Sequence, residues 1–228
     1  MLGTIVNTIA IIVGSLVGLV FKNLIPEKYN DTIMKSMSLA VILIGLQMAL
    51  GTQNILLVIC SMVGGSLVGE RIDIEKKLDN IGAKLQDRFS KTDSNIGQGF
   101  VTASLMYCIG SLAIIGAIEG GLLGKHDVLF AKSLIDGIVS VALTATMGIG
   151  VIFASVSVFL YQGSIVLISS FAKDILTDAI VTEMSAIGGL LIMGIGLNIL
   201  MRDRIKVGNM LPALFVPLVF MGIMNIIG

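Results

Sequence analysis

Six long stretches of the chain contain no Asp, Glu, Lys or Arg, and they dominate its pattern of hydrophobic and polar positions. A bilayer core about 30 Å thick is crossed by an α-helix of roughly 20 apolar residues. Four stretches therefore fit one crossing each, and the other two are long enough for two. The stretches are Met1–Phe21, Ser36–Gly69, Ser94–Ile118, Gly137–Ala172, Met184–Met201 and Val207–Gly228.

These stretches predict helices rather than strands. A transmembrane β-barrel alternates apolar and polar positions in segments of about ten residues, and no such alternation occurs here. Met1–Phe21 also lacks the basic start and the Ala-x-Ala site of a cleaved signal peptide, so we expect it to be a permanent span. We predict an all-α, polytopic membrane protein with about eight transmembrane helices, forming a single transmembrane domain over residues 1–228.

The two longest stretches need internal breaks. Gly51–Asn54 is a turn signal near the middle of the first. The second can break at Gly148–Gly150 or at Gln162–Gly163. We favour one long helix from about Leu129 to Tyr161, followed by the short segment Ser164–Lys173. That segment is either a short crossing or a re-entrant turn that lines a cavity.

The distribution of Lys and Arg predicts the orientation. With eight spans, twelve of the fifteen basic residues fall on one side, and only Lys125, Lys132 and Lys173 fall on the other. Basic residues are enriched in cytoplasmic connections, so we expect both termini to lie outside. Span two then runs outward and span seven inward.

Residues 70–98 form the one long polar segment. Apolar residues recur along it at helical spacing, with charged residues between them, which predicts a cytoplasmic amphipathic helical insertion. It either packs on the protein or the membrane surface, or serves as a docking site for a soluble partner. The apolar positions are Ile74, Leu78, Ile81, Leu85 and Phe89.

Composition excludes several classes of function. Apolar residues make up 55% of the chain, charged residues 13%, and the formal net charge is zero, so no nucleic-acid partner is expected. Cys60 and Cys108 lie in apolar stretches and are interpreted as packing residues, and His126 has no nearby set of metal ligands. We expect no metal site and no cofactor. No P-loop, nucleophile elbow or zincin motif is present, so we do not predict an enzyme.

Short internal repeats are present. Gly-Ser-Leu-Val-Gly occurs at 14–18 and at 65–69, a small-residue pattern that allows close helix packing. Ile44–Gln47 parallels Ile195–Asn198 in a span of opposite direction, and residues 104–113 more weakly parallel 133–142. Such echoes are typical of inverted repeats, which place a binding site near the membrane midplane.

Polar side chains inside spans are functional candidates because burying them in hydrocarbon is costly. The amides Asn7, Gln47, Asn198 and Asn225 either join helices by hydrogen bonds or contribute to a site. Gln47 and Asn198 occupy matching places in the proposed repeat.

Asp136, Ser140 and Thr144 are spaced four residues apart and form one stripe along a helix. A carboxylate above two hydroxyls can bind a cation or relay a proton. The alternative is an interfacial Asp136 that pairs with Lys132, four residues before it.

Three further residues are candidates. Glu119 precedes Asp136 across a short loop, so the two carboxylates could share a vestibule; a solvated loop charge is the alternative. Gln162 lies at one candidate break, where an unwound turn would expose backbone groups, although a simple loop also fits. Glu183 begins span seven and either lines the pathway or caps the helix at the interface.

Several motifs together resemble a known family over essentially the whole chain, namely the bacterial YdfK/YqgA-like membrane proteins, domain of unknown function family 554. The resemblance implies a bacterial inner-membrane location, suggests transport and gives no substrate. The motifs are Gly3–Thr8, Gly65–Glu70 with Asp73–Glu75, Tyr107–Ser111, Asp136–Ile138, Tyr161–Gly163, and Glu183–Ser185 with Gly188–Gly189.

Our leading hypothesis is an inner-membrane transporter of a small solute or ion, embedded in the lipid bilayer as a homo-oligomer. Asp136, Glu183 and the amides would line its pathway. A channel lined by the hydroxyl-bearing face of span five is the second hypothesis. The third is a non-transporting protein that regulates another membrane protein through residues 70–98.

Overall fold

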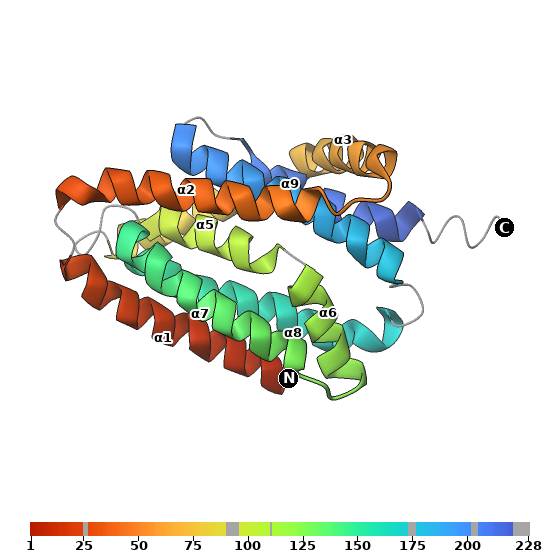
Figure 1. The fold of residues 1–228 in the computed structure, drawn as a ribbon, viewed down its shortest axis with the longest axis horizontal. Helices are drawn as coiled ribbons and strands as arrows, with labels where there is room; N and C mark the ends of the chain where they lie inside the picture. The colour runs from red at the N-terminus through yellow and green to blue at the C-terminus, as the bar shows by residue number, and fades with distance from the viewer. Residues whose placement is uncertain (25–26, 90–95, 110, 173–176, 202–204, 221–228) are drawn as a thin grey trace. The chain divides into compact units, whose positions relative to one another are not determined.

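The protein is all-helical in the part of the chain that the structure describes. The computed structural model describes residues 1–24, 27–89, 96–109, 111–172, 177–201 and 205–220, and these contain no strand (Figure 1). Lys173, Arg202, Arg204 and Asn225, which entered the sequence analysis, lie outside the described residues.

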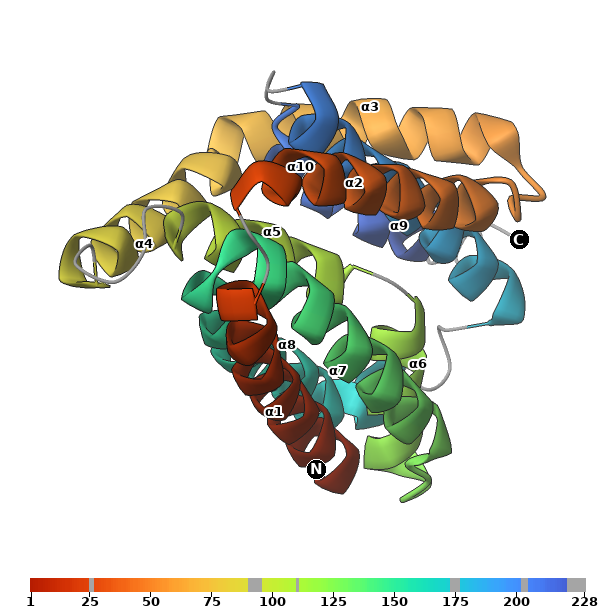
Figure 2. The same ribbon diagram turned by 60° about the vertical axis from the view of Figure 1, so that its left-hand side comes forward.

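Six of the described helices are long and apolar enough to cross a membrane, and a seventh crossing is added if the bent pair α5 and α6 is one span. A shorter apolar helix covers Val207–Phe220. Figures 1 and 2 show the helices α1 Leu2–Leu24, α2 Glu27–Ala49, α3 Ile55–Ile72, α4 Ile74–Phe89, α5 Ile96–Cys108, α6 Ser111–Leu122, α7 Asp127–Met147, η1 Ile149–Phe153, α8 Ala154–Ala172, α9 Asp178–Met201, α10 Val207–Met210 and η2 Leu211–Phe215. The prediction of an all-α polytopic membrane protein is therefore confirmed.

Helix α1 is apolar on its exposed face and carries its small and polar residues on its buried face. Thr4, Asn7 and Ser15 are fully buried, whereas large apolar side chains are exposed at every third or fourth position. An exposed apolar stripe of this length is suited to lipid rather than water. The exposed residues include Ile5, Ile9, Val13, Leu16 and Val20.

The break in the long apolar stretch lies at Gly148, not at Gln162–Gly163. Helix α7 ends at Met147, and Gly148 has φ +80°, a backbone conformation that favours glycine. Helix α8 then runs without interruption through Ser164. The predicted long helix Leu129–Tyr161 and the separate segment starting at Ser164 are both wrong, and the stretch forms two full-length helices.

The chain divides into two compact units, and each is described here by itself. The first contains Met1–Met34, Leu78–Cys108 and Leu112–Phe171; the second contains Lys35–Lys77, Ile109–Ser111 and Ala172–Gly228. In the first unit α1 and α7 run parallel, because Gly3 approaches Leu129 and Gly18 approaches Val141. In the second unit α2 and α9 run antiparallel.

The repeated Gly-Ser-Leu-Val-Gly segment is a packing device, as predicted. A Cβ atom added at Gly14 would lie 2.2 Å from the carbonyl oxygen of Gly137, and one at Gly65 would lie 2.2 Å from the amide nitrogen of Ala213. Only glycine allows this approach of backbone to backbone. The segment thus joins α1 to α7 in the first unit and α3 to the C-terminal helix in the second.

The polar segment forms a helix over a shorter range than 70–98. Glu70 belongs to α3, which ends at Asp73, a residue in the left-handed conformation with φ 55°. In α4, Gly82 packs against Gly97, and the Gln86 side chain accepts a hydrogen bond of 3.2 Å from the Gly97 amide. Of the predicted apolar positions in this helix, Ile81 is exposed. The cytoplasmic location of this helix remains a prediction.

Candidate binding site around a buried ion pair

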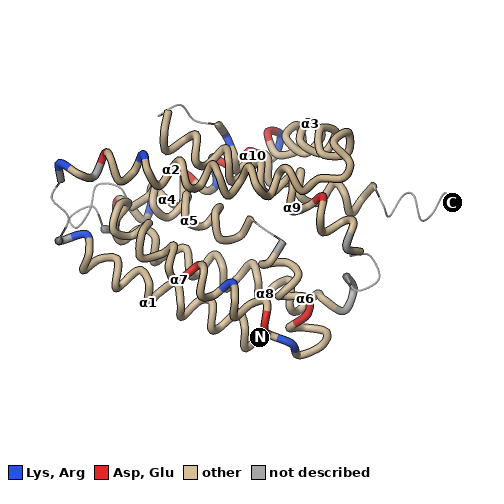
Figure 3. Tube along the Cα trace, viewed as in Figure 1, with Lys and Arg blue, Asp and Glu red and all other residues tan. Residues whose placement is uncertain are grey.

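Helix α7 buries charged and hydroxyl side chains along one face. Lys132, Asp136, Ser140 and Thr144 recur every four residues, so they point in one direction, and all four are buried. Figure 3 shows both signs of charge within the otherwise uncharged middle of α7. The predicted stripe is therefore formed, and it includes Lys132 as well.

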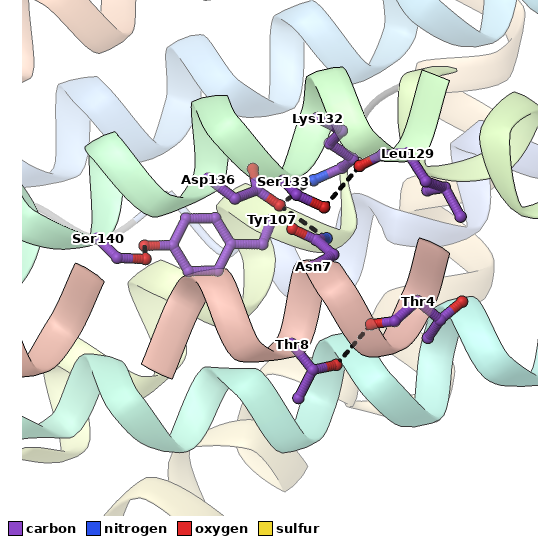
Figure 4. A network of polar contacts seen from close by, with 9 residues as sticks. All are labelled: Thr4, Asn7, Thr8, Tyr107, Leu129, Lys132, Ser133, Asp136 and Ser140. Atoms are coloured by element: carbon purple, nitrogen blue, oxygen red, sulfur yellow. Dashed lines mark hydrogen bonds and ion pairs between the residues drawn. The ribbon is translucent and has the colours of Figure 1, made fainter. Parts of the chain in front are cut away.

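The centre of the site is an ion pair between Lys132 Nζ and Asp136 Oδ2. Both residues are buried, with 5% and 6% of their surface exposed. Asn7 of α1 donates a hydrogen bond of 3.0 Å from its Nδ2 to the same carboxylate oxygen (Figure 4). The sequence left two readings of Asp136 open, a site residue and a partner of Lys132. The pairing with Lys132 is present, and both side chains are buried within the protein.

A second contact joins α5 to the stripe. The Tyr107 hydroxyl and Ser140 Oγ are 2.8 Å apart, and either can be the donor (Figure 4). Tyr107 has only 1% of its surface exposed. Because a buried phenol normally finds a hydrogen-bond partner, this contact fixes Tyr107 beside the ion pair.

Several buried polar atoms close to the stripe have no hydrogen-bond partner among the described residues. Asn7 uses Nδ2 but not Oδ1, and the hydroxyls of Thr4 and Thr144 are unpartnered. Thr4 and Asn7 lie three residues apart on α1 and therefore on one face. Buried polar groups are normally hydrogen-bonded, so oxygen acceptors left unused beside a carboxylate point to a ligand or a proton pathway.

Gln162 is fully buried in the interior of α8, and neither atom of its amide has a partner in the described part of the chain. The predicted unwound turn at Gln162 is wrong, because Ser164 Oγ donates to the Tyr161 carbonyl within a continuous helix. An unpartnered amide inside a span keeps Gln162 a candidate, now as a side chain rather than as part of a break.

Glu119 lies on α6 and is half-buried. In the described residues no hydrogen bond or ion pair joins it to Asp136, so the structure gives no support to the shared vestibule.

Glu183 stabilises the turn between α2 and α3 through hydrogen bonds. Its carboxylate accepts hydrogen bonds from Thr52 Oγ1 at 2.5 Å and from the amides of Gln53 and Asn54 at 2.8 and 3.1 Å. These groups belong to the turn between α2 and α3, where helix α3 begins. Glu183 therefore stabilises the turn before α3, whose N-cap is Asn54 itself. Its two predicted roles, lining the pathway or capping its own helix at the interface, remain predictions.

The other two amides that the structure describes belong to the second unit. Asn198 donates from Nδ2 to the Ile205 carbonyl at 2.8 Å and accepts from the Ile205 amide at 2.6 Å, which closes the connection after α9. Gln47 is exposed on α2. Asn198 therefore has a structural role, and the part of Gln47 in a pathway remains a prediction.

A second polar cluster, which the sequence did not predict, joins α3, α4 and α10. Asn209 donates to Glu70 at 2.7 Å and accepts from the Glu75 amide at 2.7 Å, and Glu75 accepts from the Gly208 amide at 2.6 Å. Lys206 donates to Glu70 at 2.5 Å, and this hydrogen bond raises the pKa of the Lys206 ammonium. Every one of these contacts is internal, so the cluster fixes the helix ends.

The polar atoms near the ion pair that have no partner in the described residues are oxygens. They are the amide oxygen of Asn7 and the hydroxyl of Thr4 on α1, with the hydroxyl of Thr144 two turns from the Asp136 carboxylate on α7. No group of three or more His, Cys, Asp or Glu side chains that could hold a metal ion occurs in the described ranges. Hard oxygen ligands with a single negative charge suit a proton, a small cation or a polar solute.

Tyr107 and Thr4 were not among the predicted site residues, and Lys132 was considered only as a possible partner of Asp136. The spacing of Lys132 and Asp136 was a usable signal, because residues four apart meet on a helix. Thr4 could have been predicted, because its hydroxyl lies one helical turn before Asn7 on the same face. Tyr107 stood in one of the family motifs, but its contact with Ser140 could not be predicted, because Ser140 lies on another helix.

The fold and this site define a polytopic α-helical membrane protein with a buried ion pair in one of its helices. The chain belongs to the family described as protein of unknown function (DUF554), whose model matches residues 2–222. This confirms the resemblance noted from the motifs.

Two relatives match almost from end to end. The chain is 36% identical over 234 residues to the uncharacterized membrane protein YdfK of Bacillus subtilis (strain 168), with 100% of this chain and 99% of YdfK covered. It is 26% identical over 218 residues to the uncharacterized protein YqgA of Escherichia coli (strain K12), with 93% of each covered. No solved structure matches the chain.

Proposed function

We propose that the protein transports a small solute or ion across the bacterial inner membrane and binds it at Asp136. The observation that carries the proposal is the buried Lys132–Asp136 pair with Asn7 bonded to the same carboxylate. Asp136 lies near the middle of the 21-residue helix α7, which supports the proposal because transporters bind their substrates near the middle of their spans.

Energetics support a functional role for this pair. On insertion scales, each charged side chain at the centre of a membrane helix costs roughly 2.5–3.5 kcal/mol. A purely structural joint between α1 and α7 does not need them, because the glycine contacts at Gly14 and Gly18 already bring the two backbones together. Because helix packing does not require this costly ion pair, a role in ligand binding explains its presence better.

An inverted repeat is part of the proposal, and the contacts of α2 with α9 support it. A Cβ at Gly45 would meet Gly189 O and Met193 N, both at 2.5 Å, and one at Gly196 would meet Ser38 O and Ile42 N, both at 3.0 Å. Gly45 and Gly196 are 151 positions apart in the sequence. The same separation relates Ser38 to Gly189 and Ile42 to Met193, so the contacts of Gly45 correspond to those of Gly196. The same shift of 151 positions aligns Ile44–Gln47 with Ile195–Asn198.

The weaker echo also falls on helices that pack antiparallel. Residues 104–108 belong to α5, residues 111–113 belong to α6, and residues 133–142 belong to α7. Gly99 lies against Met147 and Gly116 against Leu129, so the chain directions are opposite. Opposite direction within a packed pair is what an inverted repeat requires.

We further propose eight crossings with both termini outside and assembly as a homo-oligomer. The six long helices, the bent pair and the helix at 207–220 supply eight segments. Because the break lies at Gly148, this number no longer depends on a crossing as short as residues 164–173. Reporter fusions in the connections after α1, α2, α3 and α6, at η1, and after α8 and α9 should alternate in sidedness in this order. Any two consecutive fusions on one side would refute it.

The experiment that tests transport is flux into proteoliposomes that contain the purified full-length protein, with a panel of ions and small solutes. Saturable uptake by the wild type that Asp136→Asn abolishes supports the proposal. Asp127→Asn, an exposed acid in the first turn of the same helix, is the matched control and should transport normally. Rapid, non-saturable conductance would indicate a channel instead. No flux at all, with a co-purifying membrane protein, would indicate a regulator.

A further inference from the structure

Lys132 occupies the position of a cation at Asp136. Its ammonium contacts one carboxylate oxygen directly, and both side chains are more than nine-tenths buried. The site is therefore neutral with Lys132 in place. A positively charged ligand can take the carboxylate only if the ammonium leaves it, which would strand an unpaired positive charge in hydrocarbon.

We propose that the site exchanges a monovalent alkali cation for a proton, and that the proton comes from Lys132. The inference rests on the proposed transport function and names its substrate class. The cation binds the Asp136 carboxylate, the Lys132–Asp136 contact breaks, and the ammonium becomes a neutral amine by releasing one proton to the water on the open side. A buried lysine can lose its proton, because the neutral amine needs no counter-charge.

The charges balance over the cycle. Before the exchange the pair consists of a carboxylate and an ammonium; afterwards it consists of a carboxylate, a bound cation and a neutral amine. The site is neutral in both states, so it can change its exposure without carrying a bare charge across the membrane. One cation moves one way and one proton moves the other way for each cycle.

Within the described residues, one unpartnered oxygen lies beside the carboxylate, and a second lies one helical turn away on α1. Asn7 Oδ1 shares its carbon with the Nδ2 atom that is 3.0 Å from Asp136 Oδ2, so it lies beside the carboxylate, and it has no partner among the described residues. Thr4 Oγ1, fully buried and unpartnered in the same part of the chain, lies one turn earlier on the same face of α1. Hydroxyl, amide and carboxylate oxygens are the ligands that hard cations prefer.

The packing around the site favours an ion over a larger solute. On the side of the site toward Gly14, the α1 backbone lies directly against the α7 backbone, since an added Cβ at Gly14 would lie 2.2 Å from the Gly137 carbonyl oxygen. An ion needs only a few ligand atoms, whereas an organic solute needs a cavity of its own size. A single carboxylate also matches a charge of +1 better than +2.

Lys132 is the group that can supply the proton. From α5, Tyr107 and Cys108 are a phenol and a thiol, which carry no charge at neutral pH. Asn7, from α1, does not titrate. Glu119 on α6 and Tyr161 on α8 are the other titratable groups of the helices around α7, and neither is bonded to the pair in the described residues.

The test uses full-length protein in proteoliposomes with a trapped pH-sensitive dye and an imposed gradient of NaCl or KCl. The wild type should change the internal pH when the gradient is applied, with no dependence on a clamped membrane potential. Lys132→Gln should still take up the cation, but with at least tenfold less proton movement and with uptake driven by the potential. Lys132→Arg should lose both fluxes, because arginine keeps its proton.

Lys125→Gln, which changes an exposed lysine just before α7, should behave as the wild type. If the wild type moves the cation without any pH change, or if Lys132→Gln still moves protons, the exchange is refuted while transport stands. If the wild type shows saturable uptake of another solute only, the cation is refuted and the proposed function survives. If nothing is transported, both fail.

A binding measurement covers the case in which the Lys132 variants do not fold. Adding NaCl or KCl to wild-type protein in weakly buffered detergent solution should release one proton for each cation bound, and Asp136→Asn should release none. Cation binding without proton release would overturn the inference. Binding of neither cation would overturn it as well.

Discussion

Asn7 and Asp136 are 129 positions apart in the chain, and Asn7 Nδ2 lies 3.0 Å from Asp136 Oδ2 between two parallel helices. This bond connects the start of the chain to the ion pair of α7. It places an amide oxygen next to a carboxylate whose other neighbour is an ammonium. The predictions below separate what this cluster does for stability from what it does for binding.

Replacing Asn7 by Ala should lower the free energy of unfolding by about 1–2 kcal/mol. Hydrogen bonds between membrane helices contribute about 0.6 kcal/mol on average, and a charged partner strengthens them. Denaturant unfolding in detergent micelles measures the change. Thr8→Ala is the control, since the Thr8 hydroxyl bonds only to the Thr4 carbonyl of its own helix. An equal loss in both variants would contradict a specific role for the Asn7 amide.

The Lys132–Asp136 pair should show strong coupling in a double-mutant cycle. Lys132→Met or Asp136→Leu alone leaves one charge buried without its partner, which costs about 3–5 kcal/mol. The double variant removes both charges and should lose clearly less than the sum of the two single losses. Unfolding in micelles again provides the values. Additive losses would show that the two charges do not depend on each other.

Alanine at two glycines of the chain should change stability in opposite directions. At Gly14 the new Cβ would lie 2.2 Å from the Gly137 carbonyl oxygen, whereas nothing lies within 4 Å of a Cβ at Gly64. Gly14→Ala should therefore destabilise the protein by about 1–3 kcal/mol because α1 must move away from α7. Gly64→Ala should stabilise it by up to about 1 kcal/mol, since alanine favours helices. Thermal unfolding of the two variants measures both changes in stability. If both variants change stability in the same direction, the result would count against close contact of α1 with α7.

Glu183→Gln should destabilise the turn between α2 and α3. The carboxylate accepts three hydrogen bonds there, and bonds to charged groups contribute about 1.5–3 kcal/mol. Hydrogen exchange of the Gln53 and Asn54 amides should rise in this variant. Ser185→Ala, whose hydroxyl bonds to its own helix at the Val181 carbonyl, should leave that exchange unchanged. Unaltered protection in Glu183→Gln would refute the role of this carboxylate in the turn.

The apolar stretches allowed the helices to be predicted because hydrocarbon requires every backbone group to be bonded within its own helix. The stripe on α7 was also predictable, because it depends on spacing along one helix. The break at Gly148 was not, because Gly148 and Gly163 look equivalent in the sequence. Tertiary contact distinguishes them: a Cβ at the neighbouring Gly150 would lie 2.0 Å from the Ile96 carbonyl oxygen, which brings α5 against this break.

The roles of the amides could not be separated from the sequence for a similar reason. Asn7 and Asn198 are both asparagines in apolar surroundings. Asn7 bonds to a residue 129 positions away, whereas Asn198 bonds to Ile205, seven positions away in its own connection. Which partner an amide finds depends on helix packing, and packing is a property of the whole fold.

The contact between Gly45 and Gly189 restricts how α2 and α9 can move. Each glycine faces the carbonyl oxygen of the other at 2.5 Å from its added Cβ position, so the two backbones touch without intervening side chains. Sliding along the helix axes would drive larger neighbours, such as Met48, into the gap. Rotation about this contact is restricted as well, because Gly196 lies against the Ser38 carbonyl and Ile42 further along the same pair. Two separated contacts therefore fix both the register and the crossing angle, and α2 and α9 should move together as one rigid body in any change of shape.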